Sequence, residues 1–177
     1  MVLAVQYGQT PEGLALRKNM PVVLARDLMR RHRMTFPTFL RWSDRAVRCA
    51  TLHNRIETVF GWPIHVQADF NPRSLRNFPM QANGAEMLRL ACCLATERGV
   101  EVCMPVHDAV FIAAPVDRIE EHVALMQACM REASRDVLAG FELRSKAQIV
   151  RWPDRYMDED GKEMWDRVMR LTGGRNA

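Results

Sequence analysis

A histidine and an aspartate stand side by side between two apolar, β-prone runs. In the run before His107 and Asp108, apolar residues stand at every second position. This alternation would place Val102, Met104 and Val106 on one face of a strand. This pattern predicts a β-hairpin over Val100–Ala114 with the two polar residues at its tip. A carboxylate held there would be rigid and exposed, as a metal ligand requires. A solvated turn without chemistry is the simpler alternative.

A second polar set recurs every four residues. Arg73, Asn77 and Gln81 share one face of a helix that is predicted to begin at Asn71-Pro72 and to run to about Arg98. Donors on one such face can contact one strand of a nucleic acid, although a polar, solvated face is the alternative. Pro79 lies within the helix and is expected to kink it near Asn77 or to split it in two.

The basic residues are concentrated near the N-terminus. Between Arg17 and Arg55 there are ten Lys or Arg and two acids, so the rest of the chain is net acidic although the whole carries +4. Most are arginines, which bind phosphates and stack on bases. This asymmetry favours a polyanionic partner. Solvated helix faces in an arginine-rich proteome would give the same pattern.

The composition excludes several classes of protein. Hydrophobic content of 48% with 26% charged residues argues against general disorder, and no apolar run approaches the roughly 20 residues of a membrane span. The N-terminus lacks a secretory signal pattern. The five cysteines form no C-x-x-C pair, so neither a zinc site nor a disulfide framework is indicated. We therefore expect a cytoplasmic globular protein without a membrane partner.

The periodicity predicts an α+β fold. Three helices are expected first, beginning at Thr10-Pro11, spanning Pro21–Arg33 and spanning Phe36–Leu52. After them come, in order, a hairpin over Arg55–Val66, the helix from Asn71, the His-Asp hairpin, a helix over Val116–Leu138, a strand over Lys146–Val150 and a helix over Gly161–Leu171. Long helices should cover one face of an antiparallel sheet. We divide the chain into residues 1–52 and 53–177.

Four segments resemble the C-terminal part of the family A DNA polymerases, of the bacterial DNA polymerase I type. Y-G-x-x-x-x-G-L-A from residue 7 is similar to the end of the family's fingers helix, and R-x-x-x-N-x-P-M-Q-x-x-x-A-E from residue 73 is similar to its R-x-x-x-N-x-P-x-Q-x-x-x-A-D helix. Gly61 falls at the expected tip of the first hairpin, and V-H-D from residue 106 resembles motif C. The resemblance extends over roughly Met1–Val150.

The resemblance implies a DNA-directed DNA polymerase of replication or repair that uses Mg²⁺. Asp108 and His107 would be catalytic, with Asp108 as a metal ligand, and Tyr7 would lie near the templating base. The partners would be a deoxynucleoside triphosphate and primer-template DNA, the DNA being contacted by Arg73, Asn77 and Gln81. Residues 1–52 would be a helical fingers remnant, and residues 53–177 a palm-like subdomain whose palm-type sheet carries motif C.

The chain also departs from the family pattern. The first catalytic motif, D-Y-S-x-I-E-L-R, which brings the other metal-binding aspartate, is missing from the sequence, and Ala109, Pro105 and Leu3 replace the family's acid, glutamine and aromatic residue. One aspartate holds two metal ions poorly. We therefore expect no polymerisation by this chain alone, unless Asp69 or Glu86 replaces the missing ligand.

The missing carboxylate could come from a separate chain, or the chain could be a truncated or decayed gene product. In the family the first-motif strand pairs beside the hairpin. Without it, an exposed sheet edge and apolar strip near Val106–Ile112 are expected, and with them a partner or a self-associated dimer.

Two rival functions remain. A His-Asp metal phosphohydrolase also contains an H-D pair, but on a helix and with further ligands, and His53, His65 and His122 show no matching arrangement. A non-catalytic DNA-binding remnant would keep the arginine-rich helices and the Arg73 face. Duplex binding with a steep salt dependence and no dependence on metal would favour the remnant.

Overall fold

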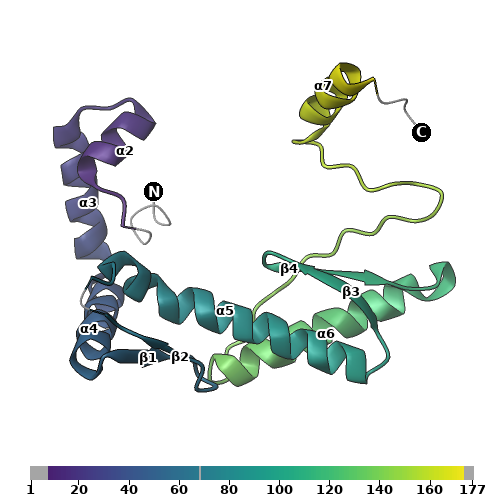
Figure 1. Cartoon of the computed structure of the whole chain (residues 1–177), viewed down its shortest axis with the longest axis horizontal. Helices are drawn as coiled ribbons and strands as arrows, with labels where there is room; N and C mark the ends of the chain where they lie inside the picture. The colour runs from purple at the N-terminus through teal and green to yellow at the C-terminus, as the bar shows by residue number, and fades with distance from the viewer. Residues whose placement is uncertain (1–7, 68, 174–177) are drawn as a thin grey trace.

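The structure is a computed structural model that describes residues 8–67 and 69–173 (Figure 1). Its helices are α2 (Pro11–Lys18), α3 (Val22–Thr35), α4 (Pro37–His53), α5 (Pro72–Glu97), α6 (Ile119–Val137) and α7 (Lys162–Thr172), with a 3₁₀ turn η1 (Val116–Arg118). Its strands are β1 (Arg55–Glu57), β2 (Pro63–His65), β3 (Glu101–Val106) and β4 (Ala109–Ala113). The α+β prediction is confirmed. Among the described residues, no helix is both long and apolar enough to cross a membrane.

The main core lies between α5, α6 and the β3–β4 hairpin. α6 contacts the C-terminal part of α5, and the hairpin packs on these helices (Figure 1). The buried cluster consists of Ala91, Ala95, Val100, Met126, Cys129 and Ala133. Because most of these side chains are small, the two helix backbones can approach closely. On the inner face of the hairpin, Val102, Val110 and Ile112 pack against this cluster. The cluster thereby supports the strands that carry the His107-Asp108 turn.

α5 is one continuous helix that passes through Pro79. The side-chain oxygen of Asn71 accepts a hydrogen bond from the amide of Arg73 at 2.9 Å, and Pro72 takes the first helical position, where its missing N–H costs nothing. A kink and a split were the two predicted outcomes at Pro79, and the split does not occur. Four residues on, Asn83 Nδ2 donates to the Pro79 carbonyl at 2.7 Å.

The β1–β2 hairpin forms a second, separate two-stranded antiparallel sheet, paired with Ile56 opposite Ile64. It contacts α4, and α4 in turn contacts α5, where Arg76 pairs with Asp44 at 2.5 Å. α2 and α3 form a small arm with a core of their own, made by Leu14, Ala15, Ala25 and Met29. The division at residues 52 and 53 stays a prediction.

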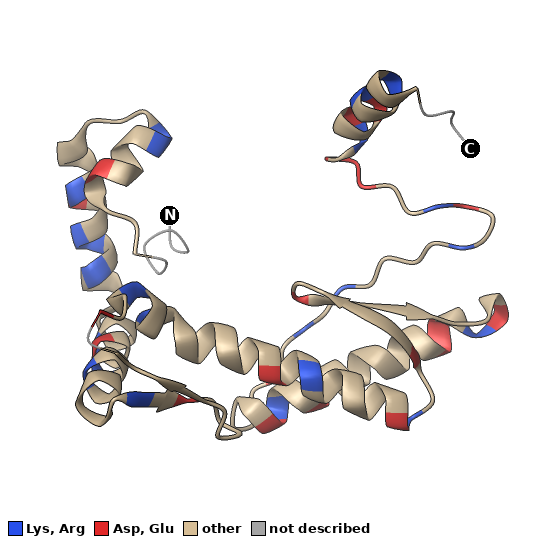
Figure 2. Ribbon diagram, viewed as in Figure 1, with Lys and Arg blue, Asp and Glu red and all other residues tan. Residues whose placement is uncertain are grey.

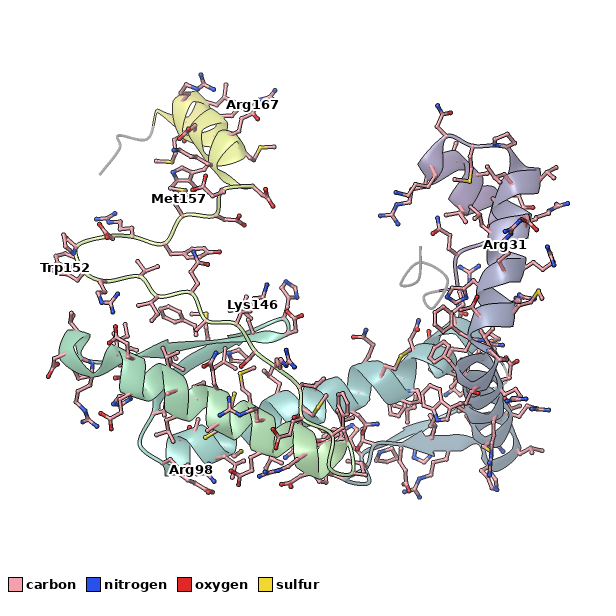
Figure 3. The ribbon with its side chains drawn as sticks, turned by 180° about the vertical axis from the view of Figure 1, so that it is seen from behind. Arg31, Arg98, Lys146, Trp152, Met157 and Arg167 are labelled. Carbon is pink, nitrogen blue, oxygen red and sulfur yellow. The ribbon has the colours of Figure 1, made fainter. Side chains whose placement is uncertain are left out.

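The strand predicted over Lys146–Val150 is wrong. Residues 141–150 contain no helix or strand, because no strand in residues 8–67 or 69–173 is hydrogen-bonded beside them and a β-strand exists only through its ladder. The segment instead runs back along α6, where Gln127 Nε2 donates to the Ser145 carbonyl at 3.1 Å and Arg151 pairs with Glu120. Beyond it, Trp152 and Met157 lie on an extended stretch that leads to α7 (Figure 3).

Candidate catalytic and nucleic-acid-binding site

His107 and Asp108 form the tip of the β3–β4 hairpin, as predicted. Val106 pairs with Ala109, so the two residues make the whole loop, and both side chains are exposed. His107 has a φ of 55°, in the left-handed region that non-glycine residues seldom adopt. Within the described residues, neither side chain has a hydrogen-bonding or ion-pair partner. The turn thus presents a free carboxylate on a supported hairpin.

The prediction that Val102, Met104 and Val106 share a strand face is wrong. A β-bulge lies between Val102 and Met104, where the register shifts from Val102 opposite Ile112 to Met104 opposite Phe111. One extra residue in a strand moves every later side chain to the other face. Val102 therefore joins the core, whereas Met104 and Val106 point outward.

The outer face of this hairpin is an exposed apolar strip. Met104 and Phe111 stand opposite each other with 53% and 56% of their surface exposed, and Val106 beside them is 46% exposed. The sequence predicted such a strip near the His-Asp turn. The partner or dimer expected to cover it stays a prediction.

The described residues do not by themselves form a two-metal site. No group of three or more His, Cys, Asp or Glu side chains gathers anywhere in the described part of the chain. Asp108 offers one carboxylate, whereas two Mg²⁺ ions need several oxygen ligands at fixed positions. The donor set fits one ligand of such a site and not the site as a whole.

Glu86, a candidate for the missing ligand, is already engaged. It is 5% exposed, its Oε1 accepts a hydrogen bond from the Thr58 hydroxyl at 2.8 Å, and its Oε2 accepts from Arg89 at 2.5 Å. The Arg89 hydrogen bonds, with that of Thr58, hold the pKa of Glu86 below its usual range against the opposing effect of burial. Oε1 attaches the β1–β2 hairpin to α5, and Oε2 pairs with Arg89 of α5 itself, so Glu86 is a structural carboxylate. Asp69 is exposed and has no such partners within the part of the chain that the structure describes.

The polar face of α5 is partly open. Arg73 and Gln81 are exposed, and Asn77 between them is half-buried. The aliphatic stem of Arg73 passes over Gly8, where a Cβ would lie 2.9 Å from Arg73 Cδ. Gly8 has a φ of 75°, so both its conformation and this close approach favour glycine. The Oδ1 atom of Asn77 is buried and has no hydrogen-bond donor among the described residues.

Tyr7, the remaining predicted site residue, lies outside the described residues. The structure places Arg73, Asn77 and Gln81 together on α5, and His107 and Asp108 together on the hairpin. Among the described residues, no hydrogen bond or ion pair joins Asp108 to Arg73 or Asn77, so the two groups are linked by the scaffold rather than by side-chain interactions. Both groups rest on α5, which contacts β3 and β4 directly.

Basic residues lie along the N-terminal helices (Figure 2). On α3, Asp27 pairs with both Arg30 and Arg31 at 2.6 Å, which neutralises part of that charge. The exposed arginines of α4 are Arg41, Arg45 and Arg48. The predicted basic region is therefore an exposed surface.

Sequence reasoning missed the attachment of the first hairpin. Thr58 and Glu86 are 28 residues apart, and so widely spaced a pair leaves no periodic signal. Likewise Asn83 Oδ1 accepts a hydrogen bond from the amide of Val59 at 2.9 Å, although Asn83 belongs to no recognised motif. The contact of Gly8 with Arg73 was also missed, although both residues stood in the family-like motifs.

Comparison with known proteins supports the resemblance. The DNA polymerase family A profile matches residues 1–149. The chain is 28% identical over 143 residues to the thermostable DNA polymerase I of Thermus thermophilus, a match that covers 73% of this chain and 17% of that protein. It is 27% identical over 153 residues to DNA polymerase I of Chloroflexus aurantiacus, over 78% of this chain and 16% of that protein. The chain thus spans about a sixth of the length of these relatives.

A solved structure with a similar fold is the POL domain of Pol1 from M. smegmatis, in complex with DNA primer-template and dNTP. The TM-score is 0.68 at 19% sequence identity, and the match covers 75% of this chain and 26% of that one. This likeness shows the fold. The match of the family profile over residues 1–149 shows that the chain belongs to the DNA polymerase family A.

Proposed function

We propose that this chain is the C-terminal, palm-side part of a DNA-directed DNA polymerase that adds deoxynucleotides to a primer 3′ end. The observation that carries the proposal is the exposed Asp108 carboxylate at a two-residue turn, on a hairpin fixed by an apolar core. Nucleotidyl transfer requires carboxylates in rigid positions close to the reacting phosphate. Asp108 meets that requirement, with His107 beside it near the primer terminus.

Mg²⁺, when bound, would supply the charge stabilisation that phosphoryl transfer needs. Asp108 is proposed as one of its ligands. The described donor set is insufficient for two ions, so we further propose that the 177-residue chain does not extend primers alone. A further carboxylate, supplied by a separate polypeptide, would complete the site.

The α5 face is proposed to hold the DNA. Arg73 can neutralise a phosphate, while Asn77 and Gln81 can contact base edges or sugars. The Oδ1 atom of Asn77 is buried and finds no donor in the described part of the chain, which supports this role. An unsatisfied acceptor is costly, and a donor on bound DNA would remove that cost once the side chain turns outward. Tyr7 is proposed to lie near the templating base, and a deoxynucleoside triphosphate is the proposed second substrate.

The test combines primer extension and DNA binding with the purified chain. We expect primer-template to bind with a steep salt dependence and no extension to occur with Mg²⁺. Extension that is lost in Asp108→Asn would confirm the polymerase assignment but contradict the claim that the chain needs another carboxylate. Failure to bind primer-template in low salt would contradict the proposed function itself.

A non-catalytic DNA-binding role is the second candidate. It is favoured by the single carboxylate at the turn and by the exposed arginines of α4. To separate the two roles, the chain is combined with a polypeptide that carries the D-Y-S-x-I-E-L-R segment. Extension that appears in the mixture and disappears with Asp108→Asn supports the polymerase role, whereas unchanged, metal-independent duplex binding supports the second one.

A further inference from the structure

The apolar side of α7 has no partner among the described residues of its own chain. α7 is only 11 residues long, and none of its residues is buried. Its apolar residues recur at helical spacing and are largely exposed: Met164 (62%), Trp165 (53%), Val168 (43%) and Leu171 (78%). Isolated helices shorter than about 12 residues are marginal in water, because helix nucleation is costly. A stable α7 therefore needs a surface to pack against.

α7 and the segment before it also lie outside the family match, which ends at residue 149. A run of three exposed acids, Asp158, Glu159 and Asp160, immediately precedes the helix. The surface that receives α7 should therefore be apolar with a basic edge.

The α2–α3 surface has these properties. It consists of Leu16, Met20, Val22, Val23 and Leu24, of which Leu16 and Val23 are 87% and 78% exposed. At the turn between the two helices is an open hollow of about 560 Å³, lined in part by Ala15, Leu16, Met20 and Val22. Arg17 and Lys18 are exposed at the end of α2, beside this hollow. Figure 2 shows basic residues on this arm and acidic ones before α7.

The exposed outer face of the β3–β4 hairpin is a poorer match. Between Gly99 and Asp117 the chain has no Lys or Arg, but it has three acids, Glu101, Asp108 and Asp117. The acidic run before α7 would be repelled there, whereas it would be attracted to Arg17 and Lys18.

In the structure α7 does not lie against the α2–α3 surface of its own chain (Figure 1). Arg151 pairs with Glu120 at the start of α6, and the ten residues 152–161 then lead to α7. Both surfaces are therefore open to a second copy of the chain.

We propose that two copies of this chain associate reciprocally, with α7 of each copy packed on the α2–α3 surface of the other. Such a two-fold arrangement repeats the same contact twice and closes on itself. The large side chain of Trp165 would enter the hollow, and the acids of residues 158–160 would pair with Arg17 and Lys18. This association is independent of the proposed polymerase chemistry.

The first test measures the mass of the full chain by light scattering and sedimentation over a range of concentrations. We expect a dimer that Val168→Asn converts to monomer. The matched control is Arg170→Asn, which places the same residue on the polar side of α7 and should leave the dimer intact. Circular dichroism checks that both variants remain folded. A wild-type chain that is monomeric at every concentration would overturn the proposal.

The second test uses charge reversal. One variant carries Asp158→Lys, Glu159→Lys and Asp160→Lys, and another carries Arg17→Glu and Lys18→Glu. Each variant alone should dimerise at least about tenfold more weakly, because like charges then meet. Mixed together they should form a heterodimer, since each tail then faces an arm of opposite charge. Absence of this rescue, or loss of the dimer through Met104→Lys on the hairpin instead, would overturn the proposal.

Discussion

The two hairpins of this protein are attached to α5 in opposite ways. The β1–β2 hairpin is held by hydrogen bonds at its turn, where Thr58 bonds Glu86 and the amide of Val59 bonds Asn83. The β3–β4 hairpin is held by apolar contacts along its inner face, through Val102 and its neighbours, and its turn is free of side-chain partners within the described residues.

This difference separates a structural turn from a chemical one. A turn whose polar groups are all bonded to the scaffold cannot also bind a ligand. A turn that is held in place only by the packing of its strands keeps its polar side chains available to bind a ligand. The position of Asp108 is therefore determined by Met126 and the residues around it. Glu86, also a carboxylate of the family-like motifs, instead uses its two oxygens in structural hydrogen bonds.

Loss of the apolar packing that holds the β3–β4 hairpin should have the largest effect on stability. Met126 is 5% exposed and belongs to the cluster beneath the β3–β4 hairpin. Met126→Ala should lower the free energy of unfolding by about 2–4 kcal/mol, through lost transfer energy and the cavity left behind. Urea denaturation measures this change. If Met126→Ala left stability unchanged, the apolar attachment of the second hairpin would be disproved.

Removal of Glu86 should come next. Glu86→Ala leaves the buried Thr58 hydroxyl without its acceptor, so we expect a loss of about 1–3 kcal/mol in the free energy of unfolding. Glu121→Ala is the matched control, because Glu121 also pairs with an arginine three residues away but is 63% exposed. The control should be indistinguishable from wild type in the same urea titration. Equal effects of the two substitutions would show that the first hairpin does not depend on Glu86.

The Glu86 contribution should also depend on pH. Its hydrogen bonds with Arg89 and Thr58 lower its pKa in the folded state below the ordinary value of 4.5. The stabilisation is therefore fully present above that value and is lost as the pH falls through the lower, folded pKa. The stability difference between wild type and Glu86→Gln should narrow below about pH 4.5. A difference that is constant from neutral to acidic pH would contradict this account.

The smallest effect on stability is expected at the His107-Asp108 turn. His107 adopts a φ of 55°, so His107→Gly should raise the free energy of unfolding by up to about 1 kcal/mol through relief of backbone strain. Ala139→Gly, at a φ of 51° outside the site, should have a similar effect. Thermal denaturation compares the two. Marked destabilisation by His107→Gly alone would mean that the histidine side chain has a structural role.

Much of the local structure was predictable from short-range signals. Asn71 and Pro72 specify the start of α5 because their side chains suit the cap and the first turn, and alternation with a polar pair predicts the His107-Asp108 turn. The four-residue spacing of Arg73, Asn77 and Gln81 is enough to put them on one face. All these signals act within one or two helical turns or within one hairpin.

Other features required the folded chain. The bulge at Cys103, which turned Met104 outward, leaves no mark on the alternation of residue types. The predicted strand over Lys146–Val150 has the right composition but no neighbouring strand, and a strand cannot form without one.

The sequence alone determined which residues could do chemistry, because side-chain type and spacing are written in it. That Asp108 stays exposed, whereas Glu86 is buried against Thr58 and Arg89, follows from the folded chain. A carboxylate's availability depends on which distant groups the fold brings within hydrogen-bonding distance.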